Sequence, residues 1–340
     1  MQRIILWVCT AVCCFSVQAQ QKPHYTQYIL NQYIINPALT GIENYVDVKL
    51  SHRHQWVGVD GAPVTTYLTA HAPLGKKDYR TTATSFEVPG ENPRGKRYWE
   101  EYTAAEPHHG IGLQVINDRT GPLNNFSAYV TYAYHLGISP RTSLAAGFGA
   151  GVTNLSLNAS KLDFGPVTQI DPAVYNTGQI NTYKPDFMVG LYLYSADYFV
   201  GVSAQQIIPQ KVAFGDNTVK TTDGKFVPHL FATAGYRFLL TEDFNLLPSV
   251  MVKYISPLPV QTDINLKLQY HDLMWIGTSY RTGEGFAGML GLNISNTMNV
   301  GYAYDYTTSR LNTVSKGTHE LMIGFTLGNK YGDWCPKNVW

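Results

Sequence analysis

Apolar and polar residues alternate along many short segments of this chain, and the segment from Asp263 to Tyr270 is one of the clearest. Every second residue there is apolar, and the residues between are charged or carry an amide. Successive side chains of a β-strand point to opposite faces, so this segment has one apolar and one polar face. Behind an export signal, repetition of the pattern along a long chain favours a barrel with lipid outside and a polar lumen inside. A large secreted β-sandwich would show a similar alternation.

The alternating segments are each roughly as long as a tilted membrane strand requires. No segment with a helical period separates them. We therefore predict an all-β fold, a transmembrane antiparallel β-barrel of about fourteen strands within residues 45–328. The predicted strands are 45–55, 64–71, 110–117, 125–136, 143–153, 186–194, 198–207, 229–239, 244–254, 262–270, 273–281, 286–295, 298–306 and 318–327.

The connecting segments sort by length, as expected of a bacterial barrel with short periplasmic turns and longer outer loops. With the first strand running outward, the insertion 74–109 is the one long connector on the periplasmic side. We interpret it as a loosely ordered insertion rather than as a docking loop for a periplasmic partner. The predicted periplasmic turns are 137–141, 195–197, 241–243, 271–272 and 296–297. The predicted outer loops are 56–63, 118–124, 155–185, 208–228, 256–261, 282–285 and 307–317.

The N-terminus has the pattern of a secretory signal peptide. One arginine precedes an apolar run from Ile4 to Val17, which is too short to span a bilayer, and Ala19 stands at the expected exit. After cleavage behind Ala19 only Cys335 remains, so no internal disulfide is expected. The expected divisions are a signal peptide (1–19), a periplasmic N-terminal lead-in (20–44), the barrel (45–328) and a C-terminal tail (329–340).

Composition narrows the classes of partner. Charged residues make up 14% of the chain, aromatic residues 13%, and the formal net charge is +1. A nearly neutral chain argues against non-specific binding of nucleic acid. Abundant aromatic residues with little charge suit the girdles of a membrane barrel, although they also suit a secreted sandwich.

Two patterns suggest binding sites and have simpler structural interpretations. The glycine-rich run from Gly147 to Gly151 resembles a phosphate-binding loop, but no helix follows it, so we predict a close backbone approach inside a barrel. His52 with His54, and His108 with His109, are spaced closely enough to chelate a metal. No acidic residue or cysteine nearby completes either set, so we predict a polar lumen or rim and no metal site.

We predict no catalytic residues and no cofactor. No serine lies in the Gly-x-Ser-x-Gly elbow that is typical of hydrolases. A further hypothesis on function is a membrane-embedded hydrolase that assembles Ser and His from separate strands.

Charged residues recur on the faces predicted to line the lumen. Asp47, Lys49 and Arg53 alternate with apolar residues of the first strand. Buried charges need partners, so we predict salt bridges that plug or stiffen the lumen. The alternative is an ion or solute path through a charged constriction. The charges on the corresponding faces of later strands are Lys253, Asp263, Lys267, Arg281, Asp305 and Glu320.

Several short motifs follow one another along nearly the whole mature chain. They include Tyr25–Tyr28, His52–Gly58, Gly110–Gly112, Asn117–Pro122 and Gly317–Glu320. Each is short, but in this order they resemble the PorP/SprF family of outer-membrane proteins, which belong to type IX secretion and gliding motility. The motif positions that we single out are Arg53, His54, Gln55, Trp56, Asn117, Asp118, Gly121 and Pro122.

The resemblance implies a non-catalytic, multi-pass β-barrel in the bilayer of the bacterial outer membrane. Its implied partners are translocon or periplasmic ring proteins, the C-terminal domain of secreted surface proteins such as adhesins, or both, and no nucleic acid. Relatives usually run almost directly from an Ala-Pro-Leu motif into the next strand, whereas residues 76–107 intervene here. The alternative function is a diffusion or uptake channel of the porin or fatty-acid-transporter type, which needs an open lumen.

The motif positions also have plain structural interpretations, which we favour for each residue taken singly. Gly121 and Pro122 lie in a predicted outer turn, where such residues set the backbone geometry. Trp56 lies at a strand end, where an aromatic belt is expected.

Overall fold

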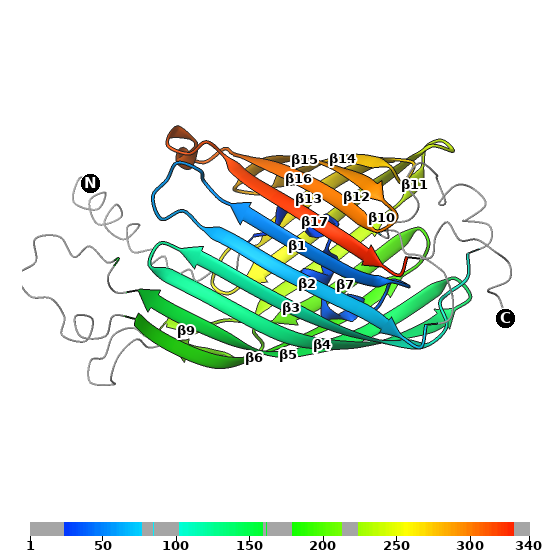
Figure 1. The fold of residues 1–340 in the computed structure, drawn as a ribbon, viewed down its shortest axis with the longest axis horizontal. Coiled ribbons are helices and arrows are strands. Elements are labelled where there is room, and N and C mark those ends of the chain that lie inside the picture. Colours follow the sequence, from blue (N-terminus) through cyan, green and yellow to red (C-terminus); the bar gives the residue numbers. More distant parts are fainter. Residues whose placement is uncertain are drawn as a thin grey trace, which may run out of the picture.

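The computed structural model describes residues 24–76, 84, 102–158, 161, 179–212 and 224–329. In these ranges, fourteen antiparallel strands form one closed barrel (Figure 1). The strands are β1 (Val46–His54), β2 (Val64–Leu74), β3 (His108–Thr120), β4 (Leu123–Ser139), β5 (Thr142–Asn158), β6 (Gln179–Tyr194), β7 (Tyr198–Gln205), β10 (His229–Tyr236) with its continuation β11 (Phe238–Leu239), β12 (Phe244–Ile255), β13 (Gln261–Tyr270), β14 (Met274–Arg281), β15 (Gly285–Ser295), β16 (Met298–Thr307) and β17 (Thr318–Leu327).

The barrel closes because its first and last strands pair. β1 pairs with β2 on one side and with β17 on the other, and β10 pairs with both β7 and β12. β11 continues β10, since it also pairs with β12. Outside this sheet, β8 (Gln210–Val212) and β9 (Gly224–Phe226) form a separate two-stranded hairpin. The 3-10 helix η5 (Arg310–Thr313) lies in the connection from β16 to β17.

The fold class and all fourteen predicted strands are confirmed. The main difference is length, because β3 to β6 extend beyond the predicted segments. For example, β6 begins at Gln179 rather than at residue 186. Pro185 lies within it, and a proline without an N–H group is normally a signal against a strand interior.

The alternation of apolar and polar residues corresponds to the two faces of the barrel wall. On β13 the Leu266 side chain is 43% exposed, whereas Asn265 and Lys267 on either side are 2% and 3% exposed. Apolar side chains therefore cover the outer surface, where lipid would lie, and polar side chains point inward. None of the helices in the described ranges is long and apolar enough to cross a membrane.

The segment from His24 to Tyr45 lies inside the barrel, and we term it the plug. It contains three short 3-10 helices, η1 (Thr26–Ile29), η2 (Gln32–Ile34) and η3 (Pro37–Leu39). Nearly all of its side chains are buried, and Figure 1 shows its dark blue ribbon between the walls. This corrects the expectation of a lead-in outside the barrel. Polar groups of the plug form hydrogen bonds with side chains of the lumen wall.

Other predicted divisions of the chain lie outside the described residues. They are the signal peptide 1–19, most of the insertion 74–109 and residues 330–340 of the tail.

Candidate functional site

Glycines of the barrel wall allow the plug backbone to approach it closely. A Cβ atom on Gly110 of β3 would lie 1.9 Å from the Thr40 carbonyl oxygen. One on Gly147 of β5 would lie 2.5 Å from the Pro37 carbonyl oxygen. No side chain can occupy that space while the plug is in place. The close backbone approach predicted for the glycine-rich run is therefore confirmed at Gly147.

Amide side chains of the wall satisfy backbone groups of the plug. Gln205 Nε2 donates a hydrogen bond to the Ile34 carbonyl oxygen at 3.0 Å, and Gln114 Nε2 donates to that of Tyr33 at 2.7 Å. Asn36 caps η3, and its own Nδ2 donates to a carbonyl oxygen of β6 at 3.1 Å. A buried irregular segment needs such partners, because its backbone groups have no ladder or long helix to satisfy them.

Three histidines of the wall surround the last turn of the plug. The Gly41 N–H donates to His71 Nδ1 at 3.2 Å, and His108 Nε2 lies 3.2 Å from the Gly41 carbonyl oxygen. His135 Nε2 lies 2.9 Å from the Thr40 carbonyl oxygen, and its ring stacks on that of His108. These imidazoles therefore fix the end of the plug that leads into β1.

The histidine pairs noted in the sequence do not form metal sites with one another. The His52 ring lies 2.8 Å from the Thr66 hydroxyl on the outer face, and His109 lies 2.6 Å from the Tyr132 hydroxyl. In the part of the chain that the structure describes, no three histidine, cysteine or acidic side chains are grouped to hold one metal ion.

Arg53 of β1 joins three elements at the barrel end where the plug begins, which we term the mouth. Its guanidinium donates to Asp305 of β16 at 2.7 Å and to Glu320 of β17 at 3.0 Å. Glu320 also accepts the Thr26 backbone N–H at 2.8 Å, and Arg53 donates to the Thr26 hydroxyl at 2.6 Å. A charge removed from water needs partners of this kind.

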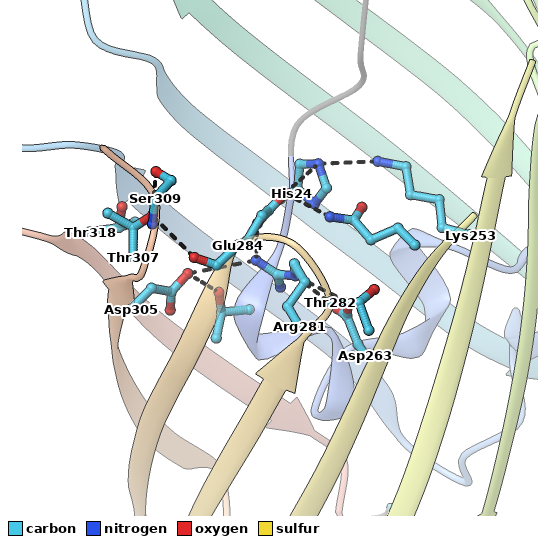
Figure 2. A network of polar contacts seen from close by, with 12 residues as sticks. His24, Lys253, Asp263, Arg281, Thr282, Glu284, Asp305, Thr307, Ser309 and Thr318 are labelled. Carbon is cyan, nitrogen blue, oxygen red and sulfur yellow. Dashed lines mark hydrogen bonds and ion pairs between the residues drawn. The ribbon is translucent and has the colours of Figure 1, made fainter. Parts of the chain in front are cut away.

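A second arginine organises the neighbouring part of the mouth (Figure 2). Arg281 of β14 pairs with Asp263 at 3.0 Å and with Glu284 at 2.9 Å. His24 lies 3.5 Å from Glu284 and 3.4 Å from Lys253 Nζ. Burial lowers the pKa of the His24 imidazole well below its usual range, and the nearby Lys253 and Arg281 charges lower it further. The salt bridges predicted inside the lumen are confirmed at both arginines.

A cavity of about 500 Å³ opens at the mouth beside Arg53 and Arg281, and we term it the mouth cavity. This volume lies in the range of ligand-binding pockets. Its lining contains charged residues together with the aromatic side chains of Trp56, Phe286 and Tyr306.

The structure brings together half of the motif positions identified in the sequence. Arg53, Gln55, Trp56 and Asp118 all line the mouth cavity, although they come from two separate motifs. His54 is exposed on the outer face of β1, and Asn117 is half-buried beside Asp118. The other two positions shape the rim: the Gly121 N–H donates to the Gly61 carbonyl oxygen at 2.9 Å, and the Pro122 carbonyl oxygen accepts from Asn158 N–H at 2.9 Å.

A comparison with protein families finds one model that matches residues 17–325, described as type IX secretion system membrane protein PorP/SprF. No curated protein matches the chain significantly. Solved structures similar to it include the toluene transporter TodX of Pseudomonas putida, with 10% identity, 90% of this chain and 94% of that chain covered, and a TM-score of 0.49. The outer membrane protein Omp33 of Acinetobacter baumannii is 11% identical, with 85% and 100% covered and a TM-score of 0.46. Similarity at this level carries no argument about function.

Proposed function

The chain belongs to the PorP/SprF family of type IX secretion system membrane proteins, and on this premise we propose that it binds protein partners during secretion and does not catalyse a reaction. The proposed partners are translocon or periplasmic ring subunits, the C-terminal domain of a secreted surface protein such as an adhesin, or both. The protein is a bacterial outer-membrane β-barrel, so these partners can meet it at either membrane surface.

Family membership over most of the chain is the observation that carries this proposal. The filled lumen adds support. A passive channel needs a continuous aqueous path, whereas the plug buries its side chains against the wall from His24 to Tyr45. An occupied lumen is compatible with a protein that presents surfaces to other proteins.

In-cell crosslinking of the affinity-tagged chain, followed by purification and mass spectrometry, tests the proposal. We expect secretion-system components, or one dominant surface protein whose C-terminal domain is retained. An unrelated outer-membrane barrel carrying the same tag is the control for non-specific recovery. Recovery of the barrel alone, in cells that express those partners, would contradict the proposal and favour a diffusion or uptake channel.

A further inference from the structure

Three buried polar atoms belong to residues that line the mouth cavity and have no hydrogen-bond partner among the residues that the structure describes. They are Arg53 Nε, Ser279 Oγ and Asp305 Oδ1. Arg53 and Ser279 are each 3% exposed. Buried polar atoms are almost always paired, because leaving one unpaired costs about 1–3 kcal/mol. One N–H donor, one carboxylate acceptor and one hydroxyl therefore point to a ligand that both accepts and donates hydrogen bonds.

The charged residues of the lining indicate the sign of the charge that the ligand carries. Among the described residues, Asp118, Glu284 and Asp305 line the cavity together with two guanidiniums, those of Arg53 and Arg281. Both guanidiniums are already occupied by carboxylates. Asp118 accepts a hydrogen bond from the Thr65 hydroxyl at 2.6 Å, and no described cation lies within 4.0 Å of it. An uncompensated carboxylate in a partly enclosed cavity attracts a cationic group.

The same wall already binds a polypeptide backbone. Glu320 accepts the N–H groups of two successive plug residues, Thr26 and Gln27, at 2.8 and 3.4 Å. The Gln27 side chain donates to the Glu320 carbonyl oxygen at 3.0 Å. The plug thus shows that this part of the barrel can hold an irregular peptide segment by its backbone.

Apolar lining residues complete the match to a peptide with a long basic side chain. Trp56, Phe286 and Leu311 lie in the same cavity as Asp118. The methylene stem of Lys or Arg packs against apolar surface while its charged end reaches a carboxylate, and a cation is also attracted to an aromatic face. A neutral or anionic surface glycan would satisfy the hydrogen bonds but would leave the Asp118 charge uncompensated.

We propose that the mouth cavity binds an extended polypeptide segment carrying Lys or Arg, with the cation at Asp118 and the peptide backbone at Arg53 Nε, Ser279 Oγ and Asp305 Oδ1. The assignment of this segment to a secreted or translocon protein rests on the proposed function. The chemistry of the site does not depend on it.

Binding of short synthetic peptides to the purified full chain in lipid nanodiscs tests the site. The probe is an acetylated and amidated Gly-Thr-Lys-Thr-Gly peptide, compared with peptides that carry Glu or norleucine in place of Lys. We expect preference for the Lys peptide and a loss of affinity of about tenfold or more in Asp118→Asn. This substitution keeps the shape of the side chain and its acceptor for Thr65. Asp60→Asn, on an exposed turn outside the cavity lining, is the matched control and should bind as the parent does.

Equal binding of the Lys and Glu peptides, or no effect of Asp118→Asn, would overturn the proposal. Preferential binding of Ca²⁺ or of a maltotriose probe at the same site would also overturn it. A photo-crosslinking residue at Leu311, in the lining of the mouth cavity, distinguishes failure of this site from failure of the proposed function. Recovery of secretion partners by the tagged chain without any crosslink at Leu311 would contradict the site alone. Binding of the Lys peptide that depends on Asp118, with no secretion partner recovered in cells, would contradict the proposed function alone.

Discussion

At the scale of single residues, Arg53 connects several parts of the mouth. It neutralises carboxylates on two strands at the closing edge of the barrel and also contacts the plug through Thr26. This one side chain therefore neutralises buried carboxylates, links the strands that close the barrel and fixes the start of the plug. A family-motif position with such partners has a structural role, whatever it also binds.

Arg53→Ala should destabilise the barrel strongly. The substitution leaves Glu320 without its cation in a buried site and leaves Asp305 with only the more distant Arg281, at 3.8 Å. Breaking a buried pair in this way costs about 3–5 kcal/mol. The free energy of unfolding in lipid bilayers, from urea titration, measures this loss. Arg310→Ala on the exposed helix η5 removes the same type of side chain and should stay within about 0.5 kcal/mol of the parent. A loss below about 1 kcal/mol for Arg53→Ala would show that the pairs are not held as described.

Gly147→Val should displace the plug from the wall. Its Cβ would lie 2.6 Å from the Ala38 nitrogen as well as close to the Pro37 carbonyl oxygen, and both are backbone atoms that cannot rotate away. Overpacking of this kind costs about 1–3 kcal/mol in the free energy of unfolding. Gly288→Val is the control, because that glycine is exposed on the outer face with nothing within 4 Å of an added Cβ. Equal stability of the two variants would contradict the close approach.

At the scale of elements, the strands were predictable because lipid and lumen impose opposite polarity on alternate residues. Leu266 between Asn265 and Lys267 carries this signal in the sequence itself. The plug was not predictable in the same way, because its partners are distant in sequence. Ile34 and Gln205 illustrate this, since nothing local indicates that they meet. One signal was present: no charged residue occurs from Tyr25 to Ile42, although the segment is rich in amides and tyrosines.

The mouth cavity was only partly predictable for the same reason. Arg53 and Asp118 were singled out as separate motif positions, but their common cavity depends on the closure of the barrel. Ser279 and Phe286 belong to no motif that we identified and were missed. They are part of the site because β14 ends and β15 begins at the mouth.

The direction of β1 across the membrane decides which surface the mouth cavity faces. If the first strand runs outward, as the connector lengths predict, the cavity opens to the cell exterior. Asp60→Cys and Asn296→Cys, each in a Cys335→Ser background, place a thiol on exposed turns at the two ends of the barrel. We expect an impermeant maleimide to label the first on whole cells and the second only after the outer membrane is opened. The reverse pattern would place the mouth cavity in the periplasm.

At the scale of the whole molecule, the plug and barrel form a single interlocked structure. The plug starts at the mouth, where His24 lies beside Glu284, and ends among the three histidines that surround Thr40 and Gly41. The chain then reverses direction into β1. Because the plug contacts the wall along this whole path, the protein's own chain occupies the lumen from the mouth to the opposite end.

The purified full chain should therefore show little steady conductance in planar bilayers. Deletion of residues 24–41 should produce large openings, because it leaves the polar faces of the strands around a water-filled pore. Heat-dependent migration in SDS gels confirms that the shortened barrel has folded before conductance is measured.

A reversible disulfide between the plug and the wall tests, without any deletion, whether the plug closes the lumen. Asn31 Nδ2 of the plug donates to Thr69 Oγ1 of β2 at 2.9 Å, so these side chains are in direct contact. Asn31→Cys combined with Thr69→Cys, in the Cys335→Ser background, would link the plug to the wall. We expect any voltage-induced openings of the full chain to disappear when this pair is oxidised and to return on reduction. The variant with Asn31→Cys alone controls for the substitution. Steady conductance that persists in the oxidised double variant would mean that solutes pass beside a fixed plug, and it would favour the channel function over the secretion role.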